Sequence, residues 1–146
     1  PTIRDRHITV HQNLQMVSDV TQVAHAAKLR DHEIIDARST ARFRGEASEP
    51  RPGLRSGHIP NSKNLPFNHV LNNDQTMKSV DELNKIFTNA GIDLKKPAIT
   101  TCGSGITAAV LSLALEKIGK SDHALYDGSW TEWGQFPTLD ISTGDG

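Results

Sequence analysis

Short apolar runs alternate along this chain with longer segments in which apolar residues recur at helical spacing. The short runs predict β-strands, and they lie at residues 32–38 ("HEIIDAR"), 64–67 ("NLPF"), 98–102 ("AITTC") and 123–128 ("HALYDG"). The helical spacing predicts α-helices at residues 16–29, 79–92 and 105–119, with a short turn or helix at "SWTEWGQ". Ser79 followed by Glu82 predicts a capping box at the start of the second helix, and Gly91 marks its end.

Strands and helices in alternation predict an α/β fold, in which a central parallel sheet is flanked by helices on both faces. Functional sites of such sheets lie beyond the carboxyl ends of the strands. Three polar clusters follow predicted strands, at residues 36–51, 102–107 and 127–133. Residues 39–64 form a long segment rich in Gly, Pro, Ser and Arg, and loops of this length are often functional. We therefore expect a site where these clusters converge.

Length and composition are those of one globular domain, so a single domain over residues 1–146 is expected. The net charge of −1 argues against a surface that binds nucleic acid. No apolar stretch approaches the roughly 20 residues of a membrane span, and no signal-peptide pattern opens the chain. A single cysteine gives no internal disulfide and no structural zinc pattern, which favours a reducing compartment, cytoplasmic or mitochondrial. The chain starts at Pro1 and ends in "DISTGDG", which we expect to be a loose tail, so it could be a piece of a longer protein.

The only cysteine, Cys102, lies in "TTCGSGITAAV" (100–110), between a predicted strand and a predicted helix. Gly103 and Gly105 allow the backbone to approach one atom closely, and loop amides ahead of a helix can hold an anion. The same surroundings favour the thiolate form of a cysteine. Most lone cysteines are inert packing residues, but packing does not require two glycines and two hydroxyl side chains directly afterwards. The reactive interpretation is favoured.

Two chemistries use a thiolate held in this way. Phosphatases need an arginine in the loop to bind phosphate, and residues 103–109 contain none. Sulfur transfer needs no such residue, because the thiolate stores sulfur as a persulfide. Without a second cysteine, the sulfur must pass to an external acceptor, and the pattern favours a sulfurtransferase.

The segment "CGSGITA" (102–108) resembles the active-site loop of 3-mercaptopyruvate sulfurtransferases in the rhodanese superfamily. Segments 36–53, 57–67 and 126–133 resemble family segments in the same order, and the likeness covers roughly residues 10–136. Asn61 replaces the family's usual glycine, at a turn position where Asn tolerates a left-handed backbone.

The resemblance implies that Cys102 takes sulfur from 3-mercaptopyruvate and releases pyruvate. Ser104 occupies the position that the family uses for proton handling. Arg42 and Arg51 match the arginines that hold the substrate carboxylate and ketone, although without the resemblance they would be interpreted as solvated surface charges. The amides that would cradle the sulfur belong to Gly103, Ser104, Gly105, Ile106 and Thr107.

Other residues of these segments are expected to serve structure. Asp36 and Arg38 are expected to pair and brace the loops, and Arg44 is expected to be structural. His58 is expected to be a hydrogen-bonded structural histidine. We expect Trp130 and Trp133 to lie in the core.

Enzymes of this type have two rhodanese-like domains, and the chain resembles the second, catalytic one. The first domain would close the cleft and supply a histidine and an acidic residue near Ser104, so its docking surface should appear here as an exposed apolar patch. The resemblance implies a small-molecule donor, an acceptor such as a small thiol, thioredoxin or cyanide, and no metal or organic cofactor. Two alternatives remain: a thiosulfate:cyanide sulfurtransferase, which the uncharged loop disfavours, and a rhodanese-like binding module without turnover.

Overall fold

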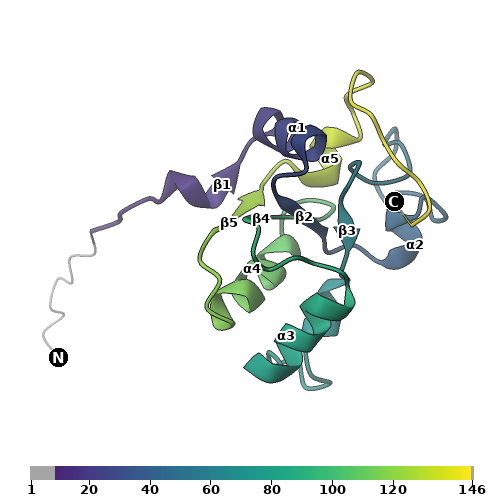
Figure 1. The fold of residues 1–146 in the computed structure, drawn as a ribbon. Coiled ribbons are helices and arrows are strands. Elements are labelled where there is room, and N and C mark those ends of the chain that lie inside the picture. Colours follow the sequence, from purple (N-terminus) through teal and green to yellow (C-terminus); the bar gives the residue numbers. More distant parts are fainter. Residues whose placement is uncertain (1–8, 146) are drawn as a thin grey trace, which may run out of the picture.

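The computed structural model describes residues 9–145, which form one α/β unit (Figure 1). Its helices are α1 (Val20–Leu29), α2 (Thr40–Phe43), α3 (Val80–Asn89), α4 (Ala108–Lys117) and α5 (Ser129–Trp133). Its strands are β1 (Val17–Ser18), β2 (Glu33–Asp36), β3 (Lys63–Asn64), β4 (Ala98–Thr101) and β5 (His123–Tyr126). Two short 3-10 helices, η1 (Leu14–Met16) and η2 (Phe67–Val70), complete the list.

The five strands form one sheet in the order β1-β5-β4-β2-β3, and every pair is parallel. The predicted parallel sheet is therefore confirmed. Strand β4 occupies the centre of the sheet, between β5 and β2. All residues of β2 and β4 are buried, as expected of strands covered on both faces.

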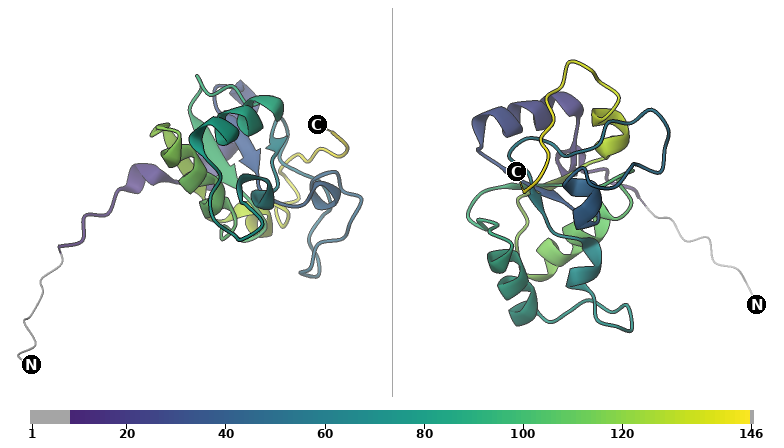
Figure 2. Two further views of the ribbon diagram at one scale, coloured as in Figure 1. Left: turned by 90° about the horizontal axis from the view of Figure 1, so that it is seen from below. Right: turned by 90° about the vertical axis from the view of Figure 1, so that its right-hand side faces the viewer.

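Helices cover both faces of the sheet (Figures 1 and 2). Side chains alternate along a strand, so neighbours Ile34 and Ile35 enter two separate hydrophobic clusters. The cluster of Ile35 includes Leu83 and Phe87 of α3 and Leu111 of α4. The other cluster joins Ile34 to α1 and to both tryptophans of α5. Trp130 and Trp133 are 1% and 2% exposed, so the prediction that they lie in the core is confirmed.

Capping boxes determine where two of the helices begin. The predicted box at Ser79 and Glu82 is present at the start of α3. A second box, formed by Asp19 and Gln22, starts α1 at Val20. The sequence-based start of this helix at residue 16 is wrong, because Val17 pairs with Leu125 in the sheet.

The predicted start of α4 at residue 105 is also too early. Gly105 has a left-handed backbone with φ of +88°, which a helix cannot contain. Residues 105–107 therefore belong to the loop that follows β4, and the helix begins at Ala108. Asn61 has φ of +63°, the left-handed conformation expected at this turn.

The C-terminal segment is held against the domain, which corrects the expected loose tail. Ser142 and His58 exchange two backbone hydrogen bonds of 2.8 and 2.9 Å. The Gly144 amide donates to the Arg44 carbonyl at 2.9 Å, and the Arg44 side chain pairs with Glu46 and Asp145. Arg44 thus has a structural role, as predicted. Residues 1–8 and 146 of the expected domain lie outside the described part of the chain.

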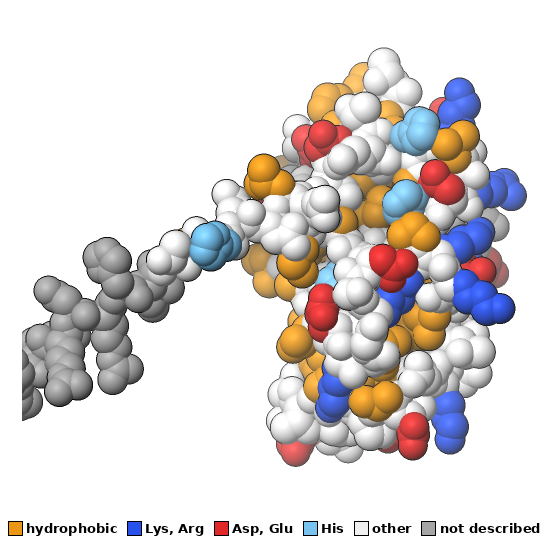
Figure 3. Space-filling view, turned by 60° about the vertical axis from the view of Figure 1, so that its left-hand side comes forward, with side chains coloured by type: hydrophobic (Ala, Val, Ile, Leu, Met, Phe, Trp, Pro, Cys, Tyr) orange, Lys and Arg blue, Asp and Glu red, His pale blue; other side chains and the backbone are white. Residues whose placement is uncertain are grey.

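Hydrophobic side chains gather where the N-terminal segment joins the domain (Figure 3). Val10, Leu14, Met16 and Val17 are between 41% and 83% exposed. The expected docking surface for a further domain stays a prediction. Within residues 9–145, no helix is long and apolar enough to cross a membrane.

His58 links α2 to the C-terminal segment from a fully buried position. Its ring stacks on Phe43 with a centroid distance of 3.7 Å, and Nδ1 lies 2.7 Å from the Phe43 carbonyl oxygen. Nδ1 must be the donor in that bond, so Nε2 carries the lone pair in the neutral ring. Among the described residues Nε2 has no hydrogen-bond partner. Burial lowers the pKa of His58, because a proton on Nε2 would be a desolvated charge.

This histidine should make the protein sensitive to mild acid. The unfolded chain protonates His58 near its ordinary pKa of about 6.5, whereas the folded protein resists protonation. The unfolded state therefore binds more protons below about pH 6.5. As the pH decreases through this range, the free energy of unfolding should fall by up to about 1.4 kcal/mol per pH unit. Urea unfolding at pH 7.5, 6.0 and 5.0 should show this slope, and His58→Asn should flatten it. An equal slope in the variant would contradict the assignment.

Candidate active site

Cys102 follows β4 directly, at the carboxyl edge of the central strand, and is 1% exposed. Its Sγ accepts a hydrogen bond of 3.1 Å from the Gly105 amide. A Cβ on Gly105 would lie 2.9 Å from the Asp127 carbonyl oxygen. Glycine is therefore required here both by the left-handed backbone and by the approach of the neighbouring loop. The loop folds back on itself so that an amide faces the sulfur.

Ser129 holds the back of the cysteine loop from the start of α5. Its Oγ accepts from the Cys102 amide at 3.1 Å and donates to the Tyr126 carbonyl at 2.8 Å. Ser129 itself is buried and has φ of +51°. The Tyr126 hydroxyl donates to Glu132 at 2.7 Å, and burial together with this acceptor raises the pKa of Tyr126 far above its usual range. Tyr126 therefore stays neutral and fixes the chain that bears Ser129.

The next residues of α5 bind the backbone of the same loop. The Trp130 amide donates to the Cys102 carbonyl at 2.9 Å. Thr131 donates twice to the Gly103 carbonyl, from its amide at 2.9 Å and from Oγ1 at 2.6 Å. Oγ1 also accepts from Arg51 at 3.4 Å. Helix α5 therefore joins the cysteine loop to one of the two predicted substrate-binding arginines.

A cavity of about 220 Å³ opens over Cys102. Its walls come from segments that follow β2, β4 and β5, as expected for the convergence of three polar clusters. The lining residues are Arg42, Glu49, Pro50, Arg51, Leu54, Cys102, Gly103, Ser104, Thr107 and Thr131.

A chain of alternating charges supports one wall of this cavity. Buried Arg38 donates three hydrogen bonds of 2.7 to 3.1 Å to the Asp36 carboxylate. It also donates to Glu49 at 2.8 Å, and Glu49 in turn accepts from Arg42 at 2.5 and 3.2 Å. The Arg38 guanidinium carbon lies 4.5 Å from the centre of the Trp130 ring. The expected pairing of Asp36 with Arg38 is present, and it extends to a residue that lines the cavity.

The structure brings most of the predicted site residues to this cavity. Arg42, Arg51, Gly103, Ser104 and Thr107 line it together with Cys102. The Ile106 side chain is 77% exposed and does not line it. Of the five loop amides expected to cradle the sulfur, that of Gly105 donates to Sγ, and residues 9–145 show no such bond from the other four.

Three polar residues that line the cavity or bind the cysteine loop were not singled out from the sequence: Glu49, Ser129 and Thr131. Ser129 and Thr131 lie in the polar cluster 127–133, whose position after β5 was the available signal. Glu49 lies in the long loop after β2, and its partners Arg38 and Arg42 stand 11 and 7 residues before it. No regular spacing could have identified that contact.

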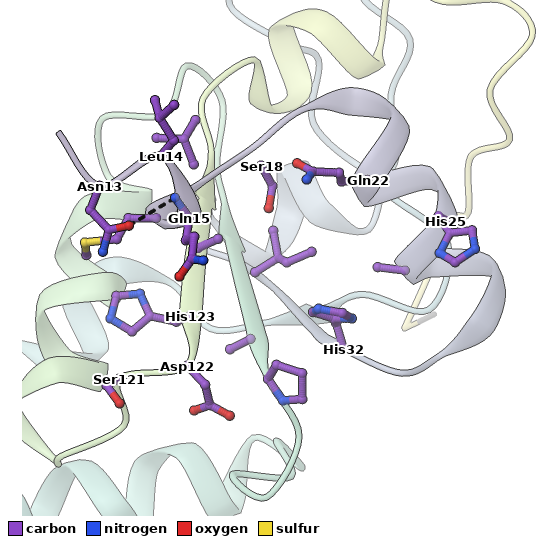
Figure 4. Close-up of a pocket in the computed structure, with 17 residues that line it drawn as sticks. Asn13, Leu14, Gln15, Ser18, Gln22, His25, His32, Ser121, Asp122 and His123 are labelled. Atoms are coloured by element: carbon purple, nitrogen blue, oxygen red, sulfur yellow. Dashed lines mark hydrogen bonds between the residues drawn. The ribbon is translucent and has the colours of Figure 1, made fainter.

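A larger cavity of about 620 Å³ lies at the amino-terminal edge of β4 and β5 (Figure 4). Three of its lining residues pair with neighbouring side chains: His32 with Asp31, Asp122 with Lys120, and His123 with Glu116. Over residues 9–145, no group of three or more His, Cys, Asp or Glu could hold a metal ion. This cavity contains no nucleophilic thiol and none of the predicted site residues, so the cavity at Cys102 is the candidate active site.

Residues 19–136 match the Rhodanese-like domain family. The chain belongs to this family. It is 47% identical over 129 residues to 3-mercaptopyruvate sulfurtransferase of Escherichia coli K12, covering 88% of this chain and 46% of that relative. It is 44% identical over 128 residues to the mitochondrial thiosulfate/3-mercaptopyruvate sulfurtransferase 1 of Arabidopsis thaliana, covering 88% of this chain and 34% of the relative.

A solved structure shows the same rhodanese fold. Tum1 protein from Saccharomyces cerevisiae superposes with a TM-score of 0.81 and 31% sequence identity, covering 90% of this chain and 48% of Tum1. This rhodanese-like chain thus spans less than half of the length of each of these three proteins.

Replacing Gly105 by alanine should disturb the site more than a matched change elsewhere. Gly91 has a similar φ of +75°, but a Cβ there would meet nothing within 4 Å. Gly91→Ala should cost only the backbone strain of about 1–2 kcal/mol. Gly105→Ala adds the clash with Asp127, so it should lower the free energy of unfolding by more than Gly91→Ala does. It should also change the rate at which Cys102 is alkylated by about threefold or more.

Urea unfolding and the rate of reaction with iodoacetamide measure these two effects. Equal unfolding free energies and equal alkylation rates for the two variants would contradict the role given to Gly105.

Proposed function

We propose that this chain is the catalytic part of a 3-mercaptopyruvate sulfurtransferase, which passes sulfur through a Cys102 persulfide to a thiol or cyanide. One observation carries the proposal. The only thiol of the chain accepts a backbone hydrogen bond at the base of a small cavity that two arginines line. The name of the Escherichia coli relative supports the choice of donor.

In the first half-reaction, the Cys102 thiolate attacks the sulfur atom of 3-mercaptopyruvate. A sulfur–sulfur bond forms and the carbon–sulfur bond breaks, and its electron pair enters the enolate of pyruvate. The proton of the substrate thiol moves to the enolate carbon, which yields pyruvate and the anionic persulfide of Cys102. This transfer of sulfur to Cys102 needs no external oxidant, because the electron pair of the broken bond stays with pyruvate. The Gly105 amide stabilises negative charge at Sγ before the attack.

Arg42 and Arg51 would hold the substrate carboxylate and ketone. A guanidinium matches a carboxylate geometrically, and a small keto acid gains rate from orientation. Ser104 is exposed and lines the cavity, so its hydroxyl can relay the proton that the enolate receives.

In the second half-reaction, an acceptor attacks the outer sulfur of the persulfide and releases the Cys102 thiolate. Cyanide leaves as thiocyanate. A small thiol or thioredoxin takes the sulfur as its own persulfide, and attack of a further thiol on that persulfide leaves a disulfide and releases hydrogen sulfide. A reducing compartment, cytoplasmic or mitochondrial, would keep both the Cys102 thiol and the acceptor thiols available.

The whole enzyme would include a further rhodanese-like domain. The relatives of this chain extend well beyond the matched region, and among the described residues that line the cavity there is no histidine and no acidic residue besides Glu49. Such a domain would supply them and close the cavity, so the present chain alone should turn over slowly.

Thiosulfate is the second candidate donor, because the name of the Arabidopsis relative includes it. The uncharged Gly103-Ser104-Gly105 segment favours 3-mercaptopyruvate over this dianion. A rhodanese-like module that binds without turnover is the remaining alternative, and the thiol placed at the cavity argues against it.

Intact mass spectrometry tests the first half-reaction directly. After exposure to 3-mercaptopyruvate the protein should gain one sulfur atom, and excess thiol should remove it. Cys102→Ser should gain none. If the wild-type protein gains no sulfur while its thiol remains free, both alone and with the first domain of a relative added, the proposed function is wrong.

A further inference from the structure

We propose that Glu49 is a specificity-determining residue, which adapts the cavity to a donor with one negative charge and holds Arg42 in position. This inference rests on the sulfurtransferase function proposed above. It concerns which anionic donors the site accepts, which is a separate question from whether Cys102 carries sulfur.

Glu49 is the only acidic residue among those that line the cavity, and its side chain is 2% exposed. Its Oε1 accepts from Arg38 at 2.8 Å and from Arg42 at 3.2 Å, while Oε2 accepts from Arg42 at 2.5 Å. The carboxylate thus binds two guanidinium groups at once. A carboxylate so buried between two cations carries its full negative charge into the wall of the site.

Glu49 also determines where the Arg42 guanidinium lies. Arg38 is immobilised by Asp36, the Gly57 carbonyl and the Trp130 ring, so it offers Glu49 a fixed anchor. Arg42 is then held directly against the cysteine loop, because a Cβ on Gly103 would be only 2.8 Å from Arg42 Nη2. Arg42 is 26% exposed, and this anchoring restricts a side chain that would otherwise move freely.

The charges at the cavity favour a monoanion. Arg42 and Arg51 are positive and Glu49 is negative, so the side chains around Cys102 carry one net positive charge. Asp36 and Arg38, behind the wall, cancel each other. An α-keto acid with one carboxylate balances this charge, whereas a dianion leaves excess negative charge in a partly buried site where screening is weak.

Glu49→Gln is the decisive variant, because it removes the charge while keeping the size of the side chain. Arg38 retains three hydrogen bonds to Asp36, so the substitution leaves no buried cation without a carboxylate. The ratio of single-turnover persulfide formation from thiosulfate to that from 3-mercaptopyruvate should rise about tenfold or more. A purely structural role would lower both rates and leave the ratio unchanged.

Two further variants separate charge from other effects. Glu49→Asp keeps the charge but shortens the side chain, so it should lower both rates and leave the donor ratio within about twofold of the wild type. Glu46→Gln is the matched control, since Glu46 lies in the same loop, is 58% exposed and pairs with Arg44. It should change neither the rates nor the ratio.

A second readout does not depend on sulfur transfer. Pyruvate and sulfate are a monoanion and a dianion that can occupy the cavity, and each should slow alkylation of Cys102 by uncharged iodoacetamide. Sulfate should slow the alkylation of wild-type Cys102 no more than pyruvate does. In Glu49→Gln, the slowing by sulfate relative to the slowing by pyruvate should increase about tenfold.

The outcomes distinguish the two proposals. Unchanged donor and protection ratios in folded Glu49→Gln would overturn the role of Glu49, even if wild-type Cys102 accepts sulfur normally. If Glu49→Gln does not fold, as judged by thermal melting, stronger protection of the wild type by sulfate than by pyruvate would overturn it. A failure of wild-type Cys102 to accept sulfur would instead count against the proposed function.

Discussion

A guanidinium that is removed from water must find acceptors for its N–H groups, and Arg38 meets this requirement with partners from distant segments. It binds Asp36 at the end of β2, the Gly57 carbonyl and Glu49, while its guanidinium carbon lies 4.5 Å from the centre of the Trp130 ring of α5. Loss of one partner would leave a buried charge or polar group unpaired, at a cost of about 3–5 kcal/mol for a broken buried ion pair. One side chain therefore ties the loops after β2, which form a wall of the candidate site, to α5.

The cysteine loop complements this wall, because it presents backbone atoms where the wall presents charges. Gly103 has no room for a side chain beside the Arg42 guanidinium, and Gly105 has none beside the Asp127 carbonyl. Neighbours on both sides thus exclude side chains from positions 103 and 105 of the loop. The space that remains is the cavity of about 220 Å³ over Cys102.

The topology explains why the site forms at this edge of the sheet. Strand β4 has a parallel neighbour on each side, so the loop after it is bordered by the loops that follow β2 and β5. Those two loops supply the arginines and the α5 residues that hold the cysteine loop. The opposite edge carries the larger cavity, where His32, Asp122 and His123 pair with neighbouring side chains and no thiol lines the space.

The sequence by itself determined the features that depend on neighbouring residues. Apolar runs located β2, β4 and β5, whereas the strand expected at 64–67 shares only Asn64 with β3. Ser79 and Glu82 fixed the start of α3, and the glycines around Cys102 indicated a loop whose backbone approaches the sulfur closely. Only the tertiary structure decided where Val17 lies, why the C-terminal segment is held against His58, and which residue anchors Arg42. Each of these depends on a contact between segments far apart in the chain or without regular spacing, which local periodicity and capping patterns do not encode.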